Sequence, residues 1–272
     1  MSLKTTLSKD PTAQNVEEAL KWLRSGQTPL VSLPLVCYRS GALADADAID
    51  AVVEDAGGRT IWDGCHASGI IPLDGKLMVS CTYKYLNGGP GAPAFIVIPE
   101  ELQGKLTPVI QGWMGQQNQF DMDWQYQPVP GMKRWASGTP PVLSLAAIEP
   151  GADMILEAGV DNIRQKSMVL TQFVIQLYRN HLQSEGFTLG TPEDPTRRGG
   201  HVALCHPEAY RICKAMIYED VIPDFRPPNI IRLGLTPLDT RYVDAYDGID
   251  ILREIMRTEK YKRLTKERSR VT

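Results

Sequence analysis

Residues 82–91 read Thr-Tyr-Lys-Tyr-Leu-Asn-Gly-Gly-Pro-Gly, and this stretch decides which fold and which chemistry the sequence predicts. It follows an apolar run at 77–81 that predicts a short strand, so Lys84 lies after a strand and before a glycine-rich turn. Functional groups of α/β proteins gather at the ends of strands. A buried ammonium tends to lose its proton, which would make Lys84 a nucleophile toward carbonyl groups. Taken alone, it could also be a lysine that reaches solvent from a strand edge.

An acid and an imidazole earlier in the chain strengthen the reactive interpretation of Lys84. Asp63 directly follows a short apolar segment at 60–62, and His66 lies three positions further on. A carboxylate at a strand end can pair with a protonated pyridine nitrogen, and His66 could stack on such a ring or hydrogen-bond to it. Considered singly, Asp63 could be a helix N-cap and His66 a structural histidine. Together with Lys84 they indicate a pyridoxal phosphate site.

Strands alternate with helices in the first half of the sequence, which predicts a parallel or mixed sheet covered by helices. Asn15 and Glu18 resemble a capping box at the start of the first helix. The expected helices span 15–24 and 45–56, and the expected strands span 30–37, 60–62, 77–81 and 94–98.

A long, mostly helical stretch at 140–182 is expected to bridge to a second, smaller α+β unit. That unit follows a polar loop at 186–200 and contains strands at 201–205 and 230–235 and helices at 207–220 and 243–257. We therefore expect a partial large domain over 1–140, linking helices over 141–185 and a small C-terminal domain over 186–272. The charged tail at 258–272 is expected to fray.

Composition narrows the class of partner. The 272 residues are 43% hydrophobic, and 29 basic and 32 acidic residues give a net charge of -3 without a stripe of one sign. This argues against nucleic acid and against an anionic membrane, and no apolar run is long enough to cross a bilayer. We expect a small-molecule or protein partner and a cytoplasmic location.

The cysteines and two of the histidines do not suggest a metal. The five cysteines are scattered and include no Cys-x-x-Cys pair, so we expect reduced thiols, mostly buried. His201 and His206 flank an apolar strand without an acidic or sulfur partner at ligand spacing, so no metal site is expected.

The chain resembles the kynureninase family. The resemblance rests on Asp63-x-x-His66 and on the block at 82–91, and it extends from about Val31 to Arg257. Further matching segments lie at 38–41, 112–113, 137–141 and 231–234. It implies a fold-type-I pyridoxal phosphate hydrolase that cleaves the Cβ–Cγ bond of L-kynurenine or 3-hydroxykynurenine to (3-hydroxy)anthranilate and L-alanine.

The resemblance also implies roles for the residues that bind the cofactor. Lys84 would hold pyridoxal phosphate as a Schiff base and then move the α-proton. Asp63 would pair with the pyridine nitrogen, and His66 would contact the ring. Tyr83 would hydrogen-bond the phosphate and help to relay protons.

Three more residues complete the implied site. Trp113 and Thr139 would reach the phosphate or substrate side from a neighbouring subunit, which makes a homodimer part of the prediction. Arg232 would bind the substrate α-carboxylate through two hydrogen bonds, a geometry that lysine cannot copy. Its alternative is a surface arginine on a strand.

Three interpretations of function stay open at this point. The region that cradles the phosphate and stacks on the ring in the family precedes the part that this chain resembles. The chain could be an active hydrolase of the kynureninase type, or a non-catalytic relative that acts through binding or dimerisation. A third interpretation keeps the cofactor and changes the reaction to one of the desulfurase or transaminase type.

Overall fold

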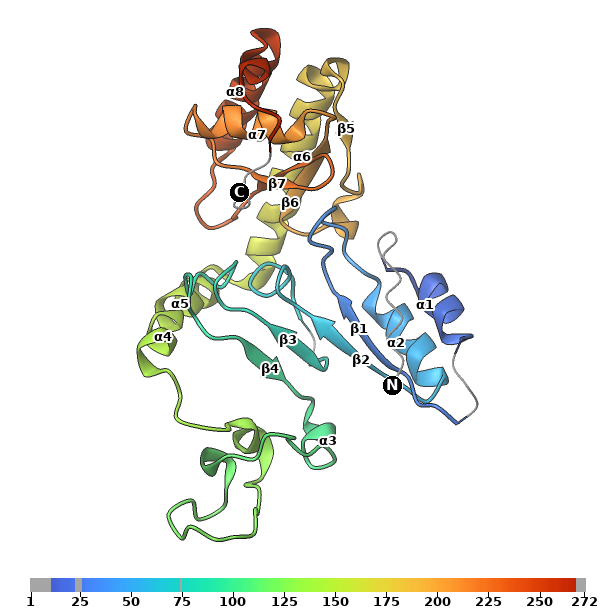
Figure 1. Ribbon diagram of the computed structural model, residues 1–272, viewed down its shortest axis with the longest axis vertical. Coiled ribbons are helices and arrows are strands. Elements are labelled where there is room, and N and C mark those ends of the chain that lie inside the picture. The colour runs from blue at the N-terminus through green and yellow to red at the C-terminus, as the bar shows by residue number, and fades with distance from the viewer. Residues whose placement is uncertain (1–10, 23–25, 74, 268–272) are drawn as a thin grey trace.

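The structure is a computed structural model that describes residues 11–22, 26–73 and 75–267. Two sheets are connected by the long helix α6 (Val160–His181): one, built from the first hundred residues, lies near the start of the helix, and one, from the last third of the chain, packs beside it (Figure 1). The α/β class with a mixed sheet and a second α+β unit, predicted from sequence, is confirmed. None of the described helices is both long and apolar enough to cross a membrane.

The first sheet has the strand order β1-β2-β3-β4. The first three strands are parallel and β4 is antiparallel, so β1, β2 and β3 end at one edge of the sheet. Trp62 and Ile49 are fully buried between the sheet and α2, and this core fixes that face. The bounds are β1 (Leu30–Pro34), β2 (Arg59–Asp63), β3 (Met78–Ser80), β4 (Phe95–Val97), α1 (Ala13–Leu20), α2 (Ala46–Asp55) and α3 (Glu100–Gln103).

The sequence predicted the start of the second helix correctly, but not the N-cap of the first. Asp45 caps α2 and accepts a hydrogen bond from the Ala48 backbone N–H at 3.2 Å, where a helix was expected to start. The expected capping box at Asn15 is wrong, because Thr12 is the N-cap of α1 and accepts from the Asn15 N–H at 3.2 Å. Residues 23–24, in which the expected first helix ends, lie outside the described residues.

The helical bridge is present but divided. It consists of α4 (Val142–Ala146), α5 (Ile148–Ala158) and α6. Gly159 separates the last two with φ +76°, a conformation that side chains disfavour, and its N–H closes α5 on the Ile155 carbonyl at 2.9 Å.

The second sheet is antiparallel with the order β5-β6-β8-β7. Its helices α7 (Ala209–Ile217) and α8 (Tyr242–Arg257) share a core with α6, in which Leu170, Leu204 and Ile231 are fully buried. The strands are β5 (Thr188–Leu189), β6 (His201–Cys205), β7 (Asp224–Arg226) and β8 (Ile230–Gly234), of which the sequence predicted β6 and β8. The domain limits at 140 and 185 stay a prediction.

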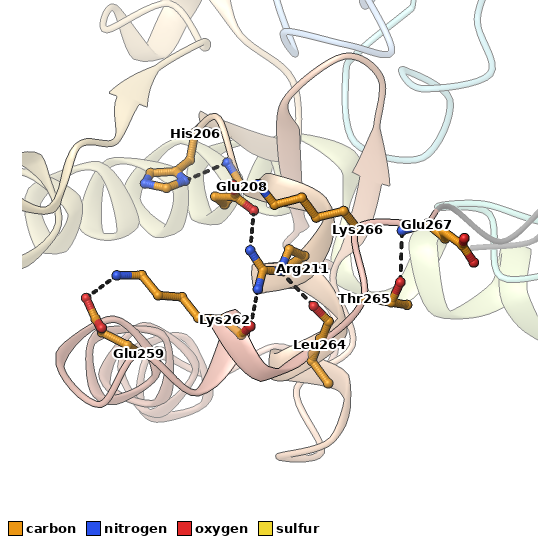
Figure 2. A network of polar contacts seen from close by, with 9 residues as sticks. All are labelled: His206, Glu208, Arg211, Glu259, Lys262, Leu264, Thr265, Lys266 and Glu267. Atoms are coloured by element: carbon orange, nitrogen blue, oxygen red, sulfur yellow. Dashed lines mark hydrogen bonds and ion pairs between the residues drawn. The ribbon is translucent and has the colours of Figure 1, made fainter.

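The charged tail is held more firmly than expected. Arg211 of α7 donates from Nε to the Leu264 carbonyl at 2.9 Å and from Nη2 to the Lys262 carbonyl (Figure 2). Its Nη1 pairs with Glu208 at 2.9 Å, and Glu208 also pairs with Lys266 at 3.2 Å. The expected fraying is therefore wrong for 258–267, whereas 268–272 lie outside the described residues.

A buried guanidinium joins α6 to the loop that precedes β6. Arg198 is 0% exposed, and its Nε donates to Thr171 Oγ1 at 2.9 Å. Nη1 donates to the carbonyls of Pro192 and Glu193 at 3.1 and 2.6 Å, and Nη2 donates to Gln172 Oε1 at 2.8 Å. Burial is the main cause that lowers the pKa of Arg198 to about 10, so the side chain is still charged at neutral pH.

Arg198→Met is expected to lower the free energy of unfolding by about 2–4 kcal/mol, because methionine fills similar space but leaves buried carbonyl oxygens without donors. The melting temperature should fall by roughly 5–10 °C. Thermal and denaturant unfolding of the variant measure this. Arg197→Met, at an exposed neighbouring position, is the matched control. Equal stability of the two variants would contradict a structural role for the Arg198 hydrogen bonds.

Candidate active site

Lys84 lies in a bend after β3, and its amine is held by two neighbours. Nζ donates to the Tyr83 hydroxyl at 3.0 Å and to Cys81 Sγ at 3.4 Å. Burial lowers the pKa of Lys84, but the hydrogen bonds to Tyr83 and Cys81 outweigh it and leave the pKa above its ordinary value. The expectation that burial deprotonates this lysine is therefore wrong for the protein without a cofactor. Cys81 was missed by the sequence argument, which treated the cysteines as inert.

Asp63 ends β2, next to β3, so its carboxylate lies at the sheet edge from which the chain continues to Lys84. The carboxylate accepts from the Cys65 N–H at 2.8 Å. Burial is the main cause that raises the pKa of the Cys65 thiol to about 12, and interactions with Asp63 and Cys81 add to it. The Cys81 thiol contacts the Cys65 carbonyl at 3.8 Å. Contacts thus run from the carboxylate through two thiols to the amine.

A cavity of about 380 Å³ lies between the two sheets. His66 and Lys84 line it from the first sheet, and Arg232 lines it from β8 of the second. Residues far apart in sequence therefore share one space, but Asp63 and Tyr83 are not among the described residues that line it. The other lining residues are Tyr85, Asn87, His201, Ile222, Asp224, Gly234, Thr236 and Asp239.

Two imidazoles of this cavity are uncharged at neutral pH. Burial, then Lys84 and Arg232, lowers the pKa of His66 to about 4. Burial, then Arg232 and His66, lowers the pKa of His201 to about 3. The two rings meet edge to face at 6.0 Å, and Nε2 of His201 is buried without a partner in the described part of the chain. Both imidazoles can therefore act as neutral hydrogen-bonding groups.

The depressed pKa of His201, which is 2% exposed, makes stability depend on pH. As pH falls below the ordinary histidine pKa of about 6.5, the unfolded chain takes up a proton that the folded protein refuses until about pH 3. Unfolding free energy is expected to fall from pH 7 to pH 4, by on the order of a few kcal/mol more in the wild type than in His201→Gln. Denaturant titrations at several pH values measure the two slopes. Parallel pH dependences would contradict this.

Arg232 is held by an acid that the sequence argument missed. Its Nε donates to Asp224 Oδ1 at 3.0 Å, its Nη2 donates to Asp224 Oδ2, and its Nη1 donates to the Tyr38 carbonyl at 2.6 Å. Asp224 lies on β7, three residues long and followed by Pro227-Pro228. Such a short strand of mixed polarity gives little sequence signal, so its pairing with Arg232 could not be foreseen.

Trp113 and Thr139 lie on one extension of the chain, and neither lines the cavity with Lys84. Both lie on an extension at 104–141 that leaves the first sheet after α3 and includes the short turns η1 (Trp113–Gly115) and η2 (Gly131–Trp135) (Figure 1). Gly112 packs so closely on Ser137 that a Cβ would come within 1.4 Å of its carbonyl oxygen. Trp113 is 46% exposed, and neither residue is among the described residues that line the cavity.

The fold matches solved structures over most of the chain. A cysteine desulfurase from Thermococcus onnurineus has a TM-score of 0.72 at 16% identity, covering 90% of this chain and 63% of that one. A C-DES mutant with glycine covalently linked to its pyridoxal phosphate has a TM-score of 0.73 at 16% identity, covering 92% and 65%. The fold is that of the fold-type-I pyridoxal phosphate enzymes.

Sequence comparison relates the chain to kynureninases. Residues 163–252 match the family model described as the kynureninase C-terminal domain. The kynureninase of Pseudomonas fluorescens is 38% identical over 234 residues, 84% of this chain and 56% of that protein. That of Burkholderia mallei is 36% identical over 241 residues, 87% and 58%. The chain is similar to these kynureninases and spans a little more than half of their length.

Proposed function

We propose that this chain binds pyridoxal phosphate at Lys84 and hydrolyses the Cβ–Cγ bond of L-kynurenine or 3-hydroxykynurenine, giving anthranilate or its 3-hydroxy form and L-alanine. The observation that carries the proposal is the cavity that holds the Lys84 amine and the Arg232 guanidinium together. Kynureninases at 36% and 38% identity supply the class of substrate.

The chemistry of the donor set fits the cofactor. An amine for its aldehyde lies in the cavity, and a carboxylate for its pyridine nitrogen ends the neighbouring strand. A neutral His66 can lie against the ring without repelling its positive charge. When bound, pyridoxal phosphate supplies an electron-poor ring that absorbs the negative charge left at the substrate α-carbon.

The chain's own groups bind, orient and move protons. Lys84 Nζ would lose a proton to solvent before it reacts, and the Tyr83 hydroxyl, within hydrogen-bond distance, would hold the amine in place. Once the amine of the substrate has replaced it at the cofactor aldehyde, the neutral Lys84 amine would take the proton from the substrate α-carbon, which is general base catalysis by a positioned side chain. Arg232 binds the α-carboxylate, and Tyr83 hydrogen-bonds the phosphate. Asp63 holds its negative charge at the ring nitrogen.

A homodimer is part of the proposal, because it gives a place to Trp113 and Thr139. The extension that carries them exposes large apolar side chains that one chain leaves uncovered. Exposed apolar patches of this kind mark interfaces. The extension is proposed to reach the site of the neighbouring subunit. The apolar residues on it that are more than half exposed are Val109, Ile110, Phe120, Met122 and Trp124.

Spectroscopy and mass spectrometry test the cofactor assignment. Wild-type protein mixed with pyridoxal phosphate is expected to show an absorbance band near the edge of the visible range. Borohydride should fix the cofactor on the peptide that contains Lys84. Addition of L-kynurenine should then give anthranilate fluorescence, and sedimentation should report a dimer.

Other outcomes would select the alternative functions. Absence of the band would favour a protein that acts by binding or dimerisation alone. A band without anthranilate, but with sulfide released from L-cysteine, would favour a desulfurase-type reaction, an alternative in keeping with the similarity of the fold to a cysteine desulfurase.

A further inference from the structure

Arg232 presents only part of its guanidinium to the cavity. A guanidinium has five N–H donors in a planar fork. Three of these are used by Asp224 Oδ1, Asp224 Oδ2 and the Tyr38 carbonyl. Within the described part of the chain, one N–H on Nη1 and one on Nη2 have no partner, whereas the edge formed by Nε and Nη2 is occupied. A carboxylate that enters the cavity therefore meets the terminal pair of nitrogens.

The charge around Arg232 is also set by its neighbours. Asp224 pairs with Arg226 as well, at 2.9 Å, so two guanidinium groups share one carboxylate and the cluster carries one net positive charge. The Arg232 side chain is only 13% exposed, and partly buried charges are screened less by salt than exposed ones. The cluster can therefore still attract one carboxylate, although Arg232 is already paired.

We propose that Asp224 is a positioning residue that holds Arg232 by one edge, so that the ligand carboxylate is bound at the other edge in a single orientation. The inference rests on the proposed function for the class of ligand, an α-amino acid with an ionised carboxylate. Asp224 also lines the cavity, and in this proposal it acts on the ligand through Arg232.

Loss of the Asp224 charge is expected to have opposite effects on the ligand: tighter binding and slower turnover. Carboxylates pair readily with two parallel N–H groups of arginine, and Asp224→Asn opens the occupied edge to the ligand. The substitution also removes a negative charge that repels the ligand carboxylate. The ligand is then bound more tightly but in more than one position. A substrate held away from the reactive geometry loses rate, not affinity.

The experiment compares wild type and Asp224→Asn in two measurements on the full chain. Calorimetric titration of the protein without cofactor with L-phenylalanine, an α-amino acid with one carboxylate, is expected to give a Kd lowered by roughly threefold to tenfold. Steady-state kinetics with pyridoxal phosphate and L-kynurenine are expected to give a kcat lowered by tenfold or more, with KM unchanged or lowered.

Three variants support the interpretation. Asp224→Glu keeps the charge and should return Kd toward the wild-type value. Arg226→Leu leaves the pair of Asp224 and Arg232 in place but makes the cluster neutral, so it should raise Kd, and it tests the same cluster if Asp224→Asn does not fold. Glu254→Gln is the matched control, because Glu254 pairs side-on with Arg257 at 2.8 and 2.6 Å on the exposed face of α8, and it should change neither constant.

Two results would overturn the inference. One is an Asp224→Asn protein with the Kd and kcat of the wild type, and the other is a loss of activity that comes from a raised KM and Kd alone. Failure of the proposed function is distinguishable, because it appears as a missing absorbance band in the wild type. The titration with L-phenylalanine needs no cofactor and tests Asp224 in either case.

Discussion

Lys84→Ala protein is expected to show no absorbance band with pyridoxal phosphate, and its turnover of L-kynurenine should fall by a factor on the order of 10⁴ or more, as for other enzymes that lose the group making the covalent bond. The methyl group that replaces the amine can neither bind the cofactor covalently nor take a proton from the α-carbon. The neighbouring Tyr83 hydroxyl and Cys81 thiol cannot form the imine in its place. Absorbance spectra and single-turnover kinetics measure both effects.

The control for Lys84 is Lys21→Ala, at an exposed position directly after α1. This variant should keep the band, the trapped peptide and the turnover of the wild type. A band that persists in Lys84→Ala, and that borohydride fixes on another lysine, would show that the attachment point has been misassigned.

Asp63→Asn is expected to keep the absorbance band and to lower kcat by roughly 10²–10³, the range found when one preorganised electrostatic group is removed from a site of developing charge. The amide oxygen can still accept from the Cys65 N–H, which the carboxylate now does at 2.8 Å, so the turn after β2 should keep its conformation. What is lost is the negative charge that keeps a pyridine nitrogen protonated.

The absorbance spectrum of Asp63→Asn reports whether the cofactor is still bound, and its steady-state kinetics report kcat, so the two effects are measured separately. Asp55→Asn, on the exposed end of α2, is the control and should leave kcat unchanged. If the band disappears in Asp63→Asn while the protein stays folded, the carboxylate holds the cofactor in place instead of tuning its electronics. An unchanged kcat would remove Asp63 from the site.

The sequence predicted the elements that depend on local pattern. Apolar runs bounded by turns gave the strands of the first sheet, and β6 and β8 were found at or within one residue of their expected limits. The shared edge of Asp63 and the chain leading to Lys84 also follows from sequence, because consecutive parallel strands end on the same side of a sheet.

Features that depend on contacts between distant segments could not be predicted. The pairing of Asp224 with Arg232 depends on β7, and a segment of three residues of mixed polarity does not predict a strand. The neutral state of His66 depends on burial and on positive charges from both sheets. The pKa of Lys84 depends on the orientations of the Tyr83 hydroxyl and the Cys81 thiol, which the sequence does not show. Burial alone therefore predicted a lowered pKa, whereas the pKa is raised.

The cavity is shared between two sheets that the chain connects through α6, and this has a mechanical consequence. A molecule bound to Lys84 at one end and to Arg232 at the other contacts both sheets and holds them in one arrangement. As more of the cavity is occupied by ligand, the two sheets move less relative to each other. A ligand that binds only the folded arrangement stabilises it in proportion to the logarithm of the ligand concentration. Heating the protein in the presence of a true substrate analogue should therefore delay unfolding of both halves as one unit.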